Sequence, residues 1–197
     1  MSKAYKILVD SYLDNNVGIS INFLSNKLAI DLRKRLSDLN ASKQLILAGT
    51  GNNTILKHDR SIRNDAIYWL DKKHKNASEN QFFREMDRFV SYLNSTCYTG
   101  IIGYEFHFAF YDAGSFYKRH LDQFKDNSHR AFSMIIYLNE NWKDGDGGEL
   151  CVHHEDHSEM ISPLNRKSVF FKSSKLEHEV MLSHQPRMSV TGWFKTN

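Results

Sequence analysis

The chain has 197 residues, of which 26 are Lys or Arg, 23 are Asp or Glu and 10 are His, giving a formal net charge of +3 at pH 7. With 41% hydrophobic and 25% charged residues, the composition is that of a globular protein and excludes wholesale disorder. The charge surplus is too small to indicate a nucleic-acid partner, and short basic runs such as 33–35 and 72–75 are typical of solvated faces.

Cysteine usage and the N-terminal residues indicate a cytoplasmic protein. Cys97 and Cys151 do not make a disulfide framework, and they fit two free thiols in a reducing compartment. Charges interrupt every short apolar stretch near the N-terminus, which therefore lacks the apolar centre of a secretory signal. No run of about 18 apolar residues is present, so no transmembrane helix is expected.

Two amphipathic helices are predicted in the N-terminal half. The first begins at Ser20, because apolar residues recur at spacings of three and four from Ile21 to Leu39. The second begins at Ser78, a capping residue with Gln81 three positions later. Its apolar face consists of Phe82, Phe83, Met86, Phe89, Val90 and Leu93. Both helices are expected to support the fold.

A long loop and a series of short strands make up the rest of the chain. Residues 47–65 are rich in Gly, Asn and charge, and a loop of this length is usually functional or disordered. A β-prone segment, 66–70, follows it. Further β-prone segments lie at 104–111, 132–138, 149–153, 168–171, 178–182 and 188–194. This spacing predicts an antiparallel jelly-roll-like barrel supported by the N-terminal helices, an α+β fold. We expect one domain over 1–197, with mainly helical support in 1–100 and the barrel in 101–197.

Three residues of the β-rich half suggest a metal site. His120 and Asp122 are separated by one residue, so in a strand both side chains leave the same face. His178 lies 56 residues later, on a segment that a barrel can bring alongside. Two histidines and one carboxylate on one face of an octahedron form the facial triad of non-haem Fe(II) oxygenases. The His-x-Asp pattern alone is weak, because it also occurs by chance.

The last predicted strand carries a candidate anion-binding residue. Alternation places Arg187, Ser189, Thr191 and Trp193 on one face and Met188, Val190 and Phe194 on the other. An arginine directed into a barrel is costly unless an anion meets it, and the far carboxylate of a dicarboxylate would do so through a bidentate contact. The alternative is an arginine on a solvated edge.

Together these residues form a pattern that resembles the iron- and 2-oxoglutarate-dependent dioxygenases. The pattern reads Tyr111-x-x-Gly114-x-x-Tyr117-x-x-His120-x-Asp122, then His178, then Arg187 nine positions later. Within this family it is similar to the prolyl 4-hydroxylase branch, in particular the oxygen-sensing (hypoxia-inducible-factor) prolyl hydroxylases and their bacterial relatives. Counterparts of Ile135-Ile-Tyr-Leu-Asn139, Trp142, Gly147-Gly148-x-Leu150, Arg63-Asn-Asp65 and Trp69 occur there in the same order, so the resemblance covers about two thirds of the chain.

The resemblance implies a double-stranded β-helix fold and a set of site residues. His120, Asp122 and His178 would hold Fe(II) and be catalytic. The residues implied for 2-oxoglutarate are Arg187, Tyr111, Tyr137 and Thr191. The residues implied for substrate are Arg130, Trp193, Arg63 and Asp65, the last two as a pair within a lid loop over the peptide. Tyr111 and Tyr137 could instead be core aromatics, and an Arg63–Asp65 pair is often only structural.

The implied activity is hydroxylation of a prolyl residue in a protein, with 2-oxoglutarate and O2 consumed and succinate and CO2 released. Ascorbate is a further candidate cofactor. A protein or peptide partner is expected, and analogy with bacterial members makes a translation factor one candidate. The alternatives are the same chemistry on another side chain, a free amino acid or a small metabolite, or a non-catalytic cupin-like metal-binding protein.

A histidine cluster at 151–157 has no counterpart in the family pattern. His153, His154 and His157 could form a second metal site, but a polar hairpin end is the simpler interpretation, because no partner cluster is visible in the sequence. Lone histidines such as His58, His107 and His184 are expected to be ordinary.

Overall fold

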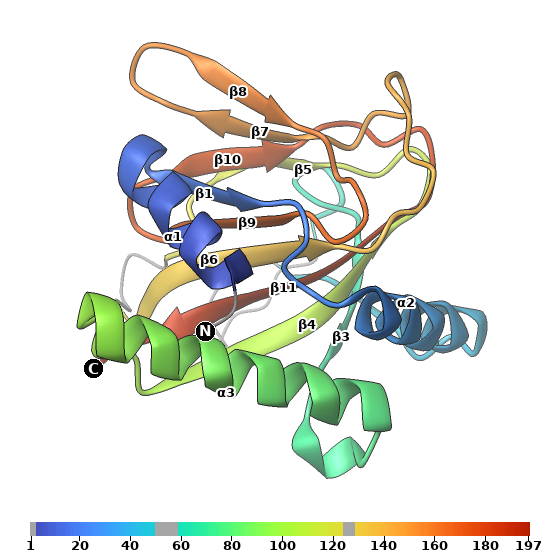
Figure 1. Cartoon of the computed structure of the whole chain (residues 1–197). Helices are drawn as coiled ribbons and strands as arrows, with labels where there is room; N and C mark the ends of the chain where they lie inside the picture. The colour runs from blue at the N-terminus through green and yellow to red at the C-terminus, as the bar shows by residue number, and fades with distance from the viewer. Residues whose placement is uncertain (1–2, 50–58, 124–128) are drawn as a thin grey trace.

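Two antiparallel β-sheets face each other, and helices cover the outer side of the larger one (Figure 1). The computed structural model of the chain describes residues 3–49, 59–123 and 129–197. In chain order the elements are α1 (Lys3–Asn15), β1 (Val17–Ser20), α2 (Asn26–Ala41), β2 (Ile46–Leu47), β3 (Ala66–Trp69), a 3-10 turn η1 (Lys72–His74), α3 (Ala77–Cys97), β4 (Gly103–Tyr111), β5 (Tyr117–His120), β6 (Arg130–Tyr137), β7 (Leu150–His153), β8 (Ser158–Ile161), β9 (Ser168–Lys172), β10 (Glu177–Val180) and β11 (Arg187–Lys195).

The strand order is that of a jelly roll. The larger sheet has seven strands in the order β1-β9-β6-β11-β4-β3-β2, and the smaller sheet has four in the order β5-β10-β7-β8. Every pairing between these strands is antiparallel. The last strand, β11, lies between β4 and β6, so segments far apart in the sequence become neighbours (Figure 1). The predicted barrel with helical support is therefore confirmed.

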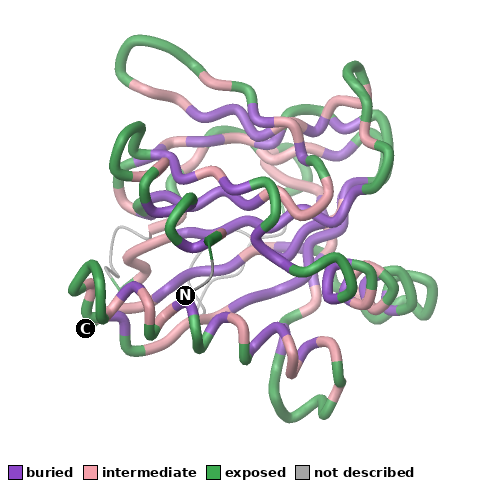
Figure 2. Tube along the Cα trace, viewed as in Figure 1, coloured by how far each residue is buried: buried purple, intermediate pink, exposed green. Residues whose placement is uncertain are grey.

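Two apolar layers hold the elements together. One joins the helices to the larger sheet and includes Phe89 of α3 and Phe194 of β11. The other fills the space between the sheets and includes Tyr137 of the larger sheet and Val152 of the smaller one. Figure 2 shows the buried stretches running along the strands and along one side of each helix. Because strand side chains alternate between faces, β4 serves both layers at once, with Phe108 in the first and Ala109 in the second.

The first predicted helix begins later than expected. Helix α2 starts at Asn26, where the Ser25 hydroxyl accepts a hydrogen bond from the Leu28 backbone N–H at 3.2 Å. Ser20, the predicted start, is instead the last residue of β1, paired with Ser168 of β9. Ile21, counted as the first residue of the apolar stripe, is 66% exposed. Residues that the helical spacing had assigned to the first turn of the helix therefore belong to strand β1 or to the segment that follows it.

The second predicted helix is capped by a different residue. Helix α3 begins at Ala77, and the Asn76 side chain accepts hydrogen bonds from the backbone N–H groups of Ser78 and Glu79 at 3.0 and 3.1 Å. Ser78 thus lies inside the first turn rather than at the cap. The predicted apolar face is correct, since five of its six residues are buried and Val90 is half-buried.

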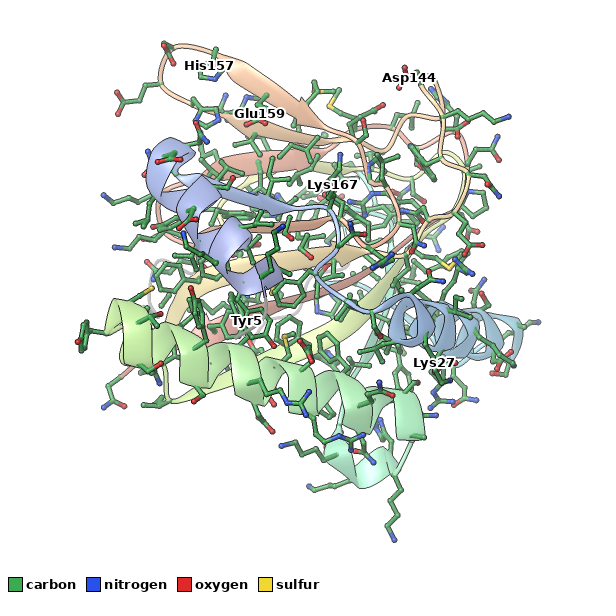
Figure 3. All side chains as sticks on the ribbon, in the orientation of Figure 1. Tyr5, Lys27, Asp144, His157, Glu159 and Lys167 are labelled. Carbon is green, nitrogen blue, oxygen red and sulfur yellow. The ribbon has the colours of Figure 1, made fainter. Side chains whose placement is uncertain are left out.

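Helix α1 and strand β1 were not predicted, and they build the N-terminal edge of the fold. Tyr5 extends from α1 toward α3 (Figure 3), where its ring lies 5.1 Å from that of Phe89. Strand β1 extends the larger sheet beyond β9. Strands β2 and β3 join the same sheet at its opposite edge, so the N-terminal half adds strands as well as helices. Over the described ranges, none of the helices is both long and apolar enough to cross a membrane.

Candidate active site

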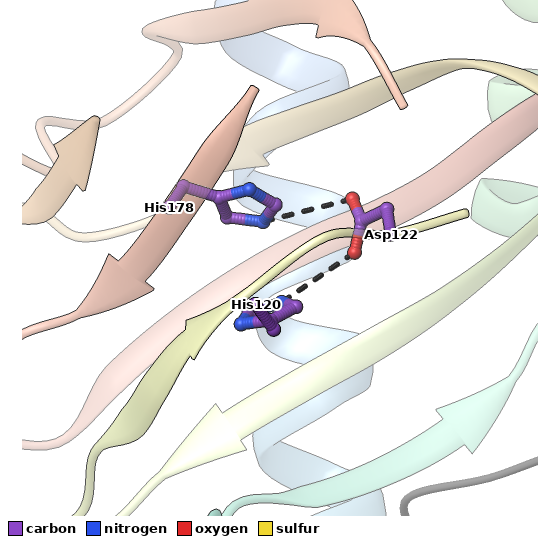
Figure 4. Close-up of side chains that lie close together, drawn as sticks. All are labelled: His120, Asp122 and His178. Atoms are coloured by element: carbon purple, nitrogen blue, oxygen red, sulfur yellow. Dashed lines mark ion pairs between the residues drawn. The ribbon is translucent and has the colours of Figure 1, made fainter. Parts of the chain in front are cut away.

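Three side chains converge in the space between the sheets. His120 ends β5, Asp122 follows it, and His178 lies on β10 directly opposite His120 in the antiparallel register. The Asp122 carboxylate lies between the two rings, with its oxygens 3.5 Å from His120 Nε2 and 3.6 Å from His178 Nε2 (Figure 4). These atoms form a group that could hold a metal ion. The triad predicted from spacing is therefore assembled in space.

Backbone carbonyl groups orient both imidazole rings. His120 Nδ1 lies 2.7 Å from the Lys118 carbonyl oxygen, and His178 Nδ1 lies 3.0 Å from the Leu176 carbonyl oxygen. A carbonyl can only accept, so each Nδ1 carries the proton and each Nε2 keeps a lone pair. Both lone pairs thus belong to the nitrogens nearest Asp122. A hydrogen bond from the other ring nitrogen, here Nδ1, usually orients a metal-binding histidine in this way.

The electrostatics favour the protonation states that metal binding requires. Burial lowers the pKa of His178 to about 4, so its ring is neutral at pH 7. Burial alone would raise the pKa of the Asp122 carboxyl, but the nearby His178 and His120 hold that pKa well below its usual range. A neutral imidazole and an ionised carboxylate are the forms that act as ligands.

A cavity of about 880 Å³ contains this group. Its walls come from both sheets: His120 and His178 belong to the smaller one, and Arg187 and Thr191 to β11 of the larger one. As predicted from the alternation of β11, Arg187, Thr191 and Trp193 all line the cavity. The Thr191 hydroxyl lies 3.1 Å from the Ser189 hydroxyl.

Arg187 is a buried cation with unused hydrogen-bonding capacity. It is 1% exposed, and its Nε donates to the Gly148 carbonyl oxygen at 2.8 Å. Among the described residues, neither its Nη2 nor the Tyr137 hydroxyl has a hydrogen-bond partner. A buried charge left in this way is costly unless an anion reaches it. The geometry therefore excludes the alternative of an arginine on a solvated edge.

Two tyrosines flank this guanidinium because of the strand register. Tyr111 is directly opposite Arg187 across β4 and β11, and Tyr137 is opposite Ser189 across β6 and β11. The Arg187 guanidinium lies 4.8 Å from the Tyr111 ring centre and 5.0 Å from that of Tyr137. Burial raises the pKa of both hydroxyls, so both stay protonated. Protonated hydroxyls and a guanidinium together form a donor set that suits a carboxylate.

Gly148 allows the backbone to approach Arg187. It has φ of +68°, and a Cβ added there would lie 2.8 Å from the Ser183 hydroxyl and 3.1 Å from Arg187 Cδ. The left-handed backbone and the close contact both favour glycine.

A second layer of contacts supports His120. The Tyr117 ring stacks on the His120 ring with centres 3.6 Å apart, and the Arg63 guanidinium lies 4.1 Å from the Tyr117 ring centre. Arg63 in turn donates to both carboxylate oxygens of Asp65 at 2.7 and 2.6 Å. The predicted Arg63–Asp65 pair is therefore present. The lid proposed for 47–65 lies partly outside the described residues, because 50–58 are not among them.

Arg130 and Trp193 form a wall beside the triad. The Arg130 guanidinium lies 3.5 Å from the Trp193 ring centre and donates to the Glu105 carboxylate at 2.9 and 3.0 Å. It also donates to the Asp122 carbonyl oxygen at 3.3 Å. Both residues line the cavity.

His107 and Trp69 were not assigned to the site from the sequence, yet both line the cavity. His107 is paired with Thr191 and Trp69 on the two neighbouring strands, and its ring lies 5.0 Å from that of Trp69 and 5.4 Å from that of Trp193. The alternation of β4 could have predicted this position, because it places His107 on the same strand face as Tyr111. A histidine expected to be ordinary is thus a buried part of the cavity wall.

The histidine cluster at 151–157 lies on a hairpin, as predicted. Strands β7 and β8 pair around it, and His157 is near the tip (Figure 3). The His154 and His157 rings stack with centres 4.4 Å apart.

Comparison with known proteins identifies the class to which this fold and cavity belong. The family model of the 2OG-Fe(II) oxygenase superfamily matches residues 106–195, which include the triad and Arg187. The chain is 30% identical to a prolyl-4-hydroxylase from Pseudomonas putida, covering 98% of this chain and 99% of that one with a TM-score of 0.87. The chain belongs to the 2OG-Fe(II) oxygenase superfamily, and it is a 2-oxoglutarate-dependent dioxygenase.

Two further structures share the fold. A prolyl hydroxylase from Trichoplax adhaerens, solved with a hypoxia-inducible-factor peptide, is 23% identical with a TM-score of 0.83, covering 97% of this chain and 88% of that one. A viral collagen prolyl hydroxylase from Paramecium Bursaria Chlorella virus-1 is 18% identical with a TM-score of 0.63, covering 93% and 97%. The family uses Fe(II), 2-oxoglutarate and O2. The His120, Asp122 and His178 donors fit Fe(II). Arg187, whose Nη2 has no partner among the described residues, fits a carboxylate of 2-oxoglutarate.

Proposed function

We propose that this enzyme hydroxylates a prolyl residue in a protein substrate, with succinate and CO2 as co-products. One observation carries the proposal. A His/Asp/His group shares one cavity with a buried arginine whose Nη2 has no hydrogen-bond partner among the described residues, in a chain that is 30% identical to a bacterial prolyl-4-hydroxylase over nearly its whole length. When bound, the iron centre with 2-oxoglutarate and O2 supplies oxidative decarboxylation and transfer of one oxygen atom.

His120, Asp122 and His178 are the metal ligands in this proposal. Their donor atoms lie within 4.8 Å of one another, and all three residues line the cavity, so the co-substrate and oxygen could reach a metal held there from the cavity side. The two backbone carbonyls hold the rings in the orientation for ligation, so the protein needs little rearrangement to take up the metal. Tyr117 stacks on His120 and further restricts that ring.

Arg187 binds the far carboxylate of 2-oxoglutarate in this proposal. Its free Nη2 and the Tyr137 hydroxyl would donate to that carboxylate, and Tyr111 and Thr191 complete the wall around it. The carboxylate would then neutralise the buried guanidinium, so binding removes an electrostatic cost of the free enzyme.

The substrate side of the cavity is formed by aromatic and cationic groups. Trp193, held flat against Arg130, would pack against the target ring. Arg63 borders the same cavity, and Asp65 fixes the direction of its guanidinium through two hydrogen bonds. These groups can keep water from the reacting centre once a peptide is seated.

The same comparison supports a protein or peptide as the partner. The Trichoplax adhaerens enzyme was solved with a peptide fragment, and the present cavity is large enough for a side chain together with the co-substrate. Analogy with bacterial members favours a translation factor as the partner, and the cysteine usage favours a cytoplasmic location. The same chemistry on a free amino acid or a metabolite is the competing proposal.

Succinate release tests the proposal. Purified enzyme with Fe(II), ascorbate and 2-oxoglutarate is incubated with a library of peptides containing a central proline, and with a matched library containing alanine at that position. We expect proline-dependent succinate and a product heavier by one oxygen atom on the proline, both lost in His120→Ala. Succinate stimulated equally by both libraries would overturn prolyl specificity, and stimulation by free amino acids would favour the competing proposal.

A further inference from the structure

The outer face of the smaller sheet carries a second group of potential metal ligands. Cys151 and His153 lie two positions apart on β7, so their side chains share one face. Glu179 of β10 is directly opposite Cys151 in the antiparallel register. The Cys151 Sγ, one His153 ring nitrogen and one Glu179 carboxylate oxygen all lie within 4.8 Å of one another.

This group is separate from the iron site because strand side chains alternate. His178 points between the sheets toward Asp122, whereas its neighbour Glu179 leaves the other face of β10. Figure 1 shows β10 lying between β5 and β7, so one strand presents a ligand to each side of the sheet. The outer group therefore cannot be a part of the catalytic cavity.

The local contacts resemble those of a preorganised site. His153 Nε2 lies 2.9 Å from Glu179 Oε1, and His153 Nδ1 lies 3.0 Å from the Ser158 hydroxyl. Ser158 is the register partner of His153 across β7 and β8. A carboxylate can only accept, so Nε2 carries the ring proton here and Nδ1 accepts from the Ser158 hydroxyl. The two contacts fix the ring, and a metal that binds Nε2 would displace its proton.

The burial and charge of the group also suit a divalent cation. Cys151 is 6% exposed, and the side chains of His153 and Glu179 are 14% and 29% exposed. The neighbouring Glu177 is engaged by Arg119 at 2.8 Å, which leaves Glu179 as the acidic group next to Cys151 and His153. A thiolate and a carboxylate together balance two positive charges. Burial raises the pKa of the Cys151 thiol, so a metal must displace its proton.

We propose that Cys151, His153 and Glu179 form a Zn²⁺ site on the outer face of the smaller sheet, with water as the fourth ligand. Thiolate, imidazole and carboxylate are ligands that Zn²⁺ accepts in a tetrahedral arrangement. Bond lengths of about 2.0–2.3 Å place tetrahedral ligand atoms roughly 3.5 Å apart. The three ligand atoms already lie within 4.8 Å of one another, so side-chain adjustment alone could place them around the ion. The ion would join β7 to β10 directly behind His178.

Cobalt substitution tests this site independently of activity. The full chain, freed of iron, is titrated with Co²⁺ without oxygen. We expect a sulfur-to-cobalt charge-transfer band that is complete once both metal sites are filled and is removed by Zn²⁺. The His120/Asp122/His178 group contains no sulfur, so it cannot produce this band. A wild-type protein that shows no such band overturns the proposal.

Three variants locate the signal. Cys151→Ser should lose the band, whereas Cys97→Ser, which removes the exposed thiol, and Asp122→Ala should both retain it. A band that survives Cys151→Ser or disappears in Cys97→Ser would refute the assignment. If Cys151→Ser does not fold, as judged by circular dichroism, His153→Asn and Ser158→Ala replace it. We expect these two to weaken Zn²⁺ affinity at least 10-fold in competition with a chelator, and wild-type affinity in both would also overturn the site.

Discussion

Replacing Arg187 by methionine should separate co-substrate affinity from stability. The change removes the guanidinium that is 1% exposed and has an unpartnered Nη2. Breaking a buried ion pair by removing one partner costs about 3–5 kcal/mol, because the other charge is left without its partner. The KM for 2-oxoglutarate should therefore rise by roughly two to three and a half orders of magnitude.

Arg187→Met should weaken co-substrate binding without lowering the stability of the enzyme in the absence of 2-oxoglutarate. In the part of the chain that the structure describes, no acidic side chain pairs with this buried guanidinium, so methionine of similar length removes an unfavourable contribution to folding. We expect the Tm of the free variant to equal or exceed that of the wild type. Added 2-oxoglutarate with Mn²⁺ should raise the Tm of the wild type but not that of the variant.

Succinate release gives the KM, and thermal unfolding gives the two Tm values. Arg166→Met is the matched control, because Arg166 also donates from Nε to a backbone carbonyl, that of Leu24 at 2.9 Å, but does not line the cavity. It should leave the KM unchanged. An Arg187→Met variant whose KM stays within threefold of the wild type would refute the anion-binding role, and a large loss of Tm would refute the electrostatic argument.

Three further predictions follow from single contacts. His120→Ala should lower succinate release at least 10³-fold while the Tm stays within a few degrees, and normal turnover would remove this residue from the metal site. Gly148→Ala should lower the unfolding free energy by about 1–3 kcal/mol, as measured by denaturant unfolding, because the backbone at this position is left-handed. The added methyl group should also displace Arg187 and so raise the KM for 2-oxoglutarate, as measured by succinate release. Burial lowers the pKa of His107 to about 4 from 6.5, so the unfolded chain binds its proton first as the pH falls. As the pH falls from 6.5 to 4, this residue should lower the unfolding free energy by about 1.4 kcal/mol per pH unit. His107→Phe should remove that part of the pH dependence of the unfolding free energy. An unchanged pH dependence in the variant would contradict the burial argument.

The strands and the triad could be predicted because their signals are local. The alternation of β11 separates the cavity residues Arg187, Thr191 and Trp193 from the apolar residues that face the helices, and the structure confirms that division. His120 and Asp122 lie together at the end of β5. The pairing of β10 with β5 then places His178 next to them. Alternation along single strands therefore predicted the His120/Asp122 pair and the cavity face of β11, whereas the other candidate residues came from the family resemblance.

The N-terminal elements could not be predicted in the same way, because tertiary contacts define them. Tyr5 of α1 packs against Phe23 and Phe89, which are far away in the sequence. Ser20 lies at the head of a helical apolar pattern, but its pairing with Ser168 makes it a strand residue. His107 was missed for a related reason, because its neighbours Trp69 and Thr191 come from two other strands.

The two ends of the co-substrate site depend on different sheets. The metal-ligand candidates His120 and His178 lie on the smaller sheet, whereas Arg187, Tyr111 and Tyr137 lie on the larger one. In the proposed binding mode, the separation between the metal ligands and the Arg187 guanidinium is therefore set by the apolar layer that packs between the sheets. A protein interior is close-packed and deforms little, so this layer fixes the length of the dicarboxylate that can bridge the two ends. Selectivity for 2-oxoglutarate over shorter or longer diacids thus depends on core packing as much as on the residues that touch the ligand.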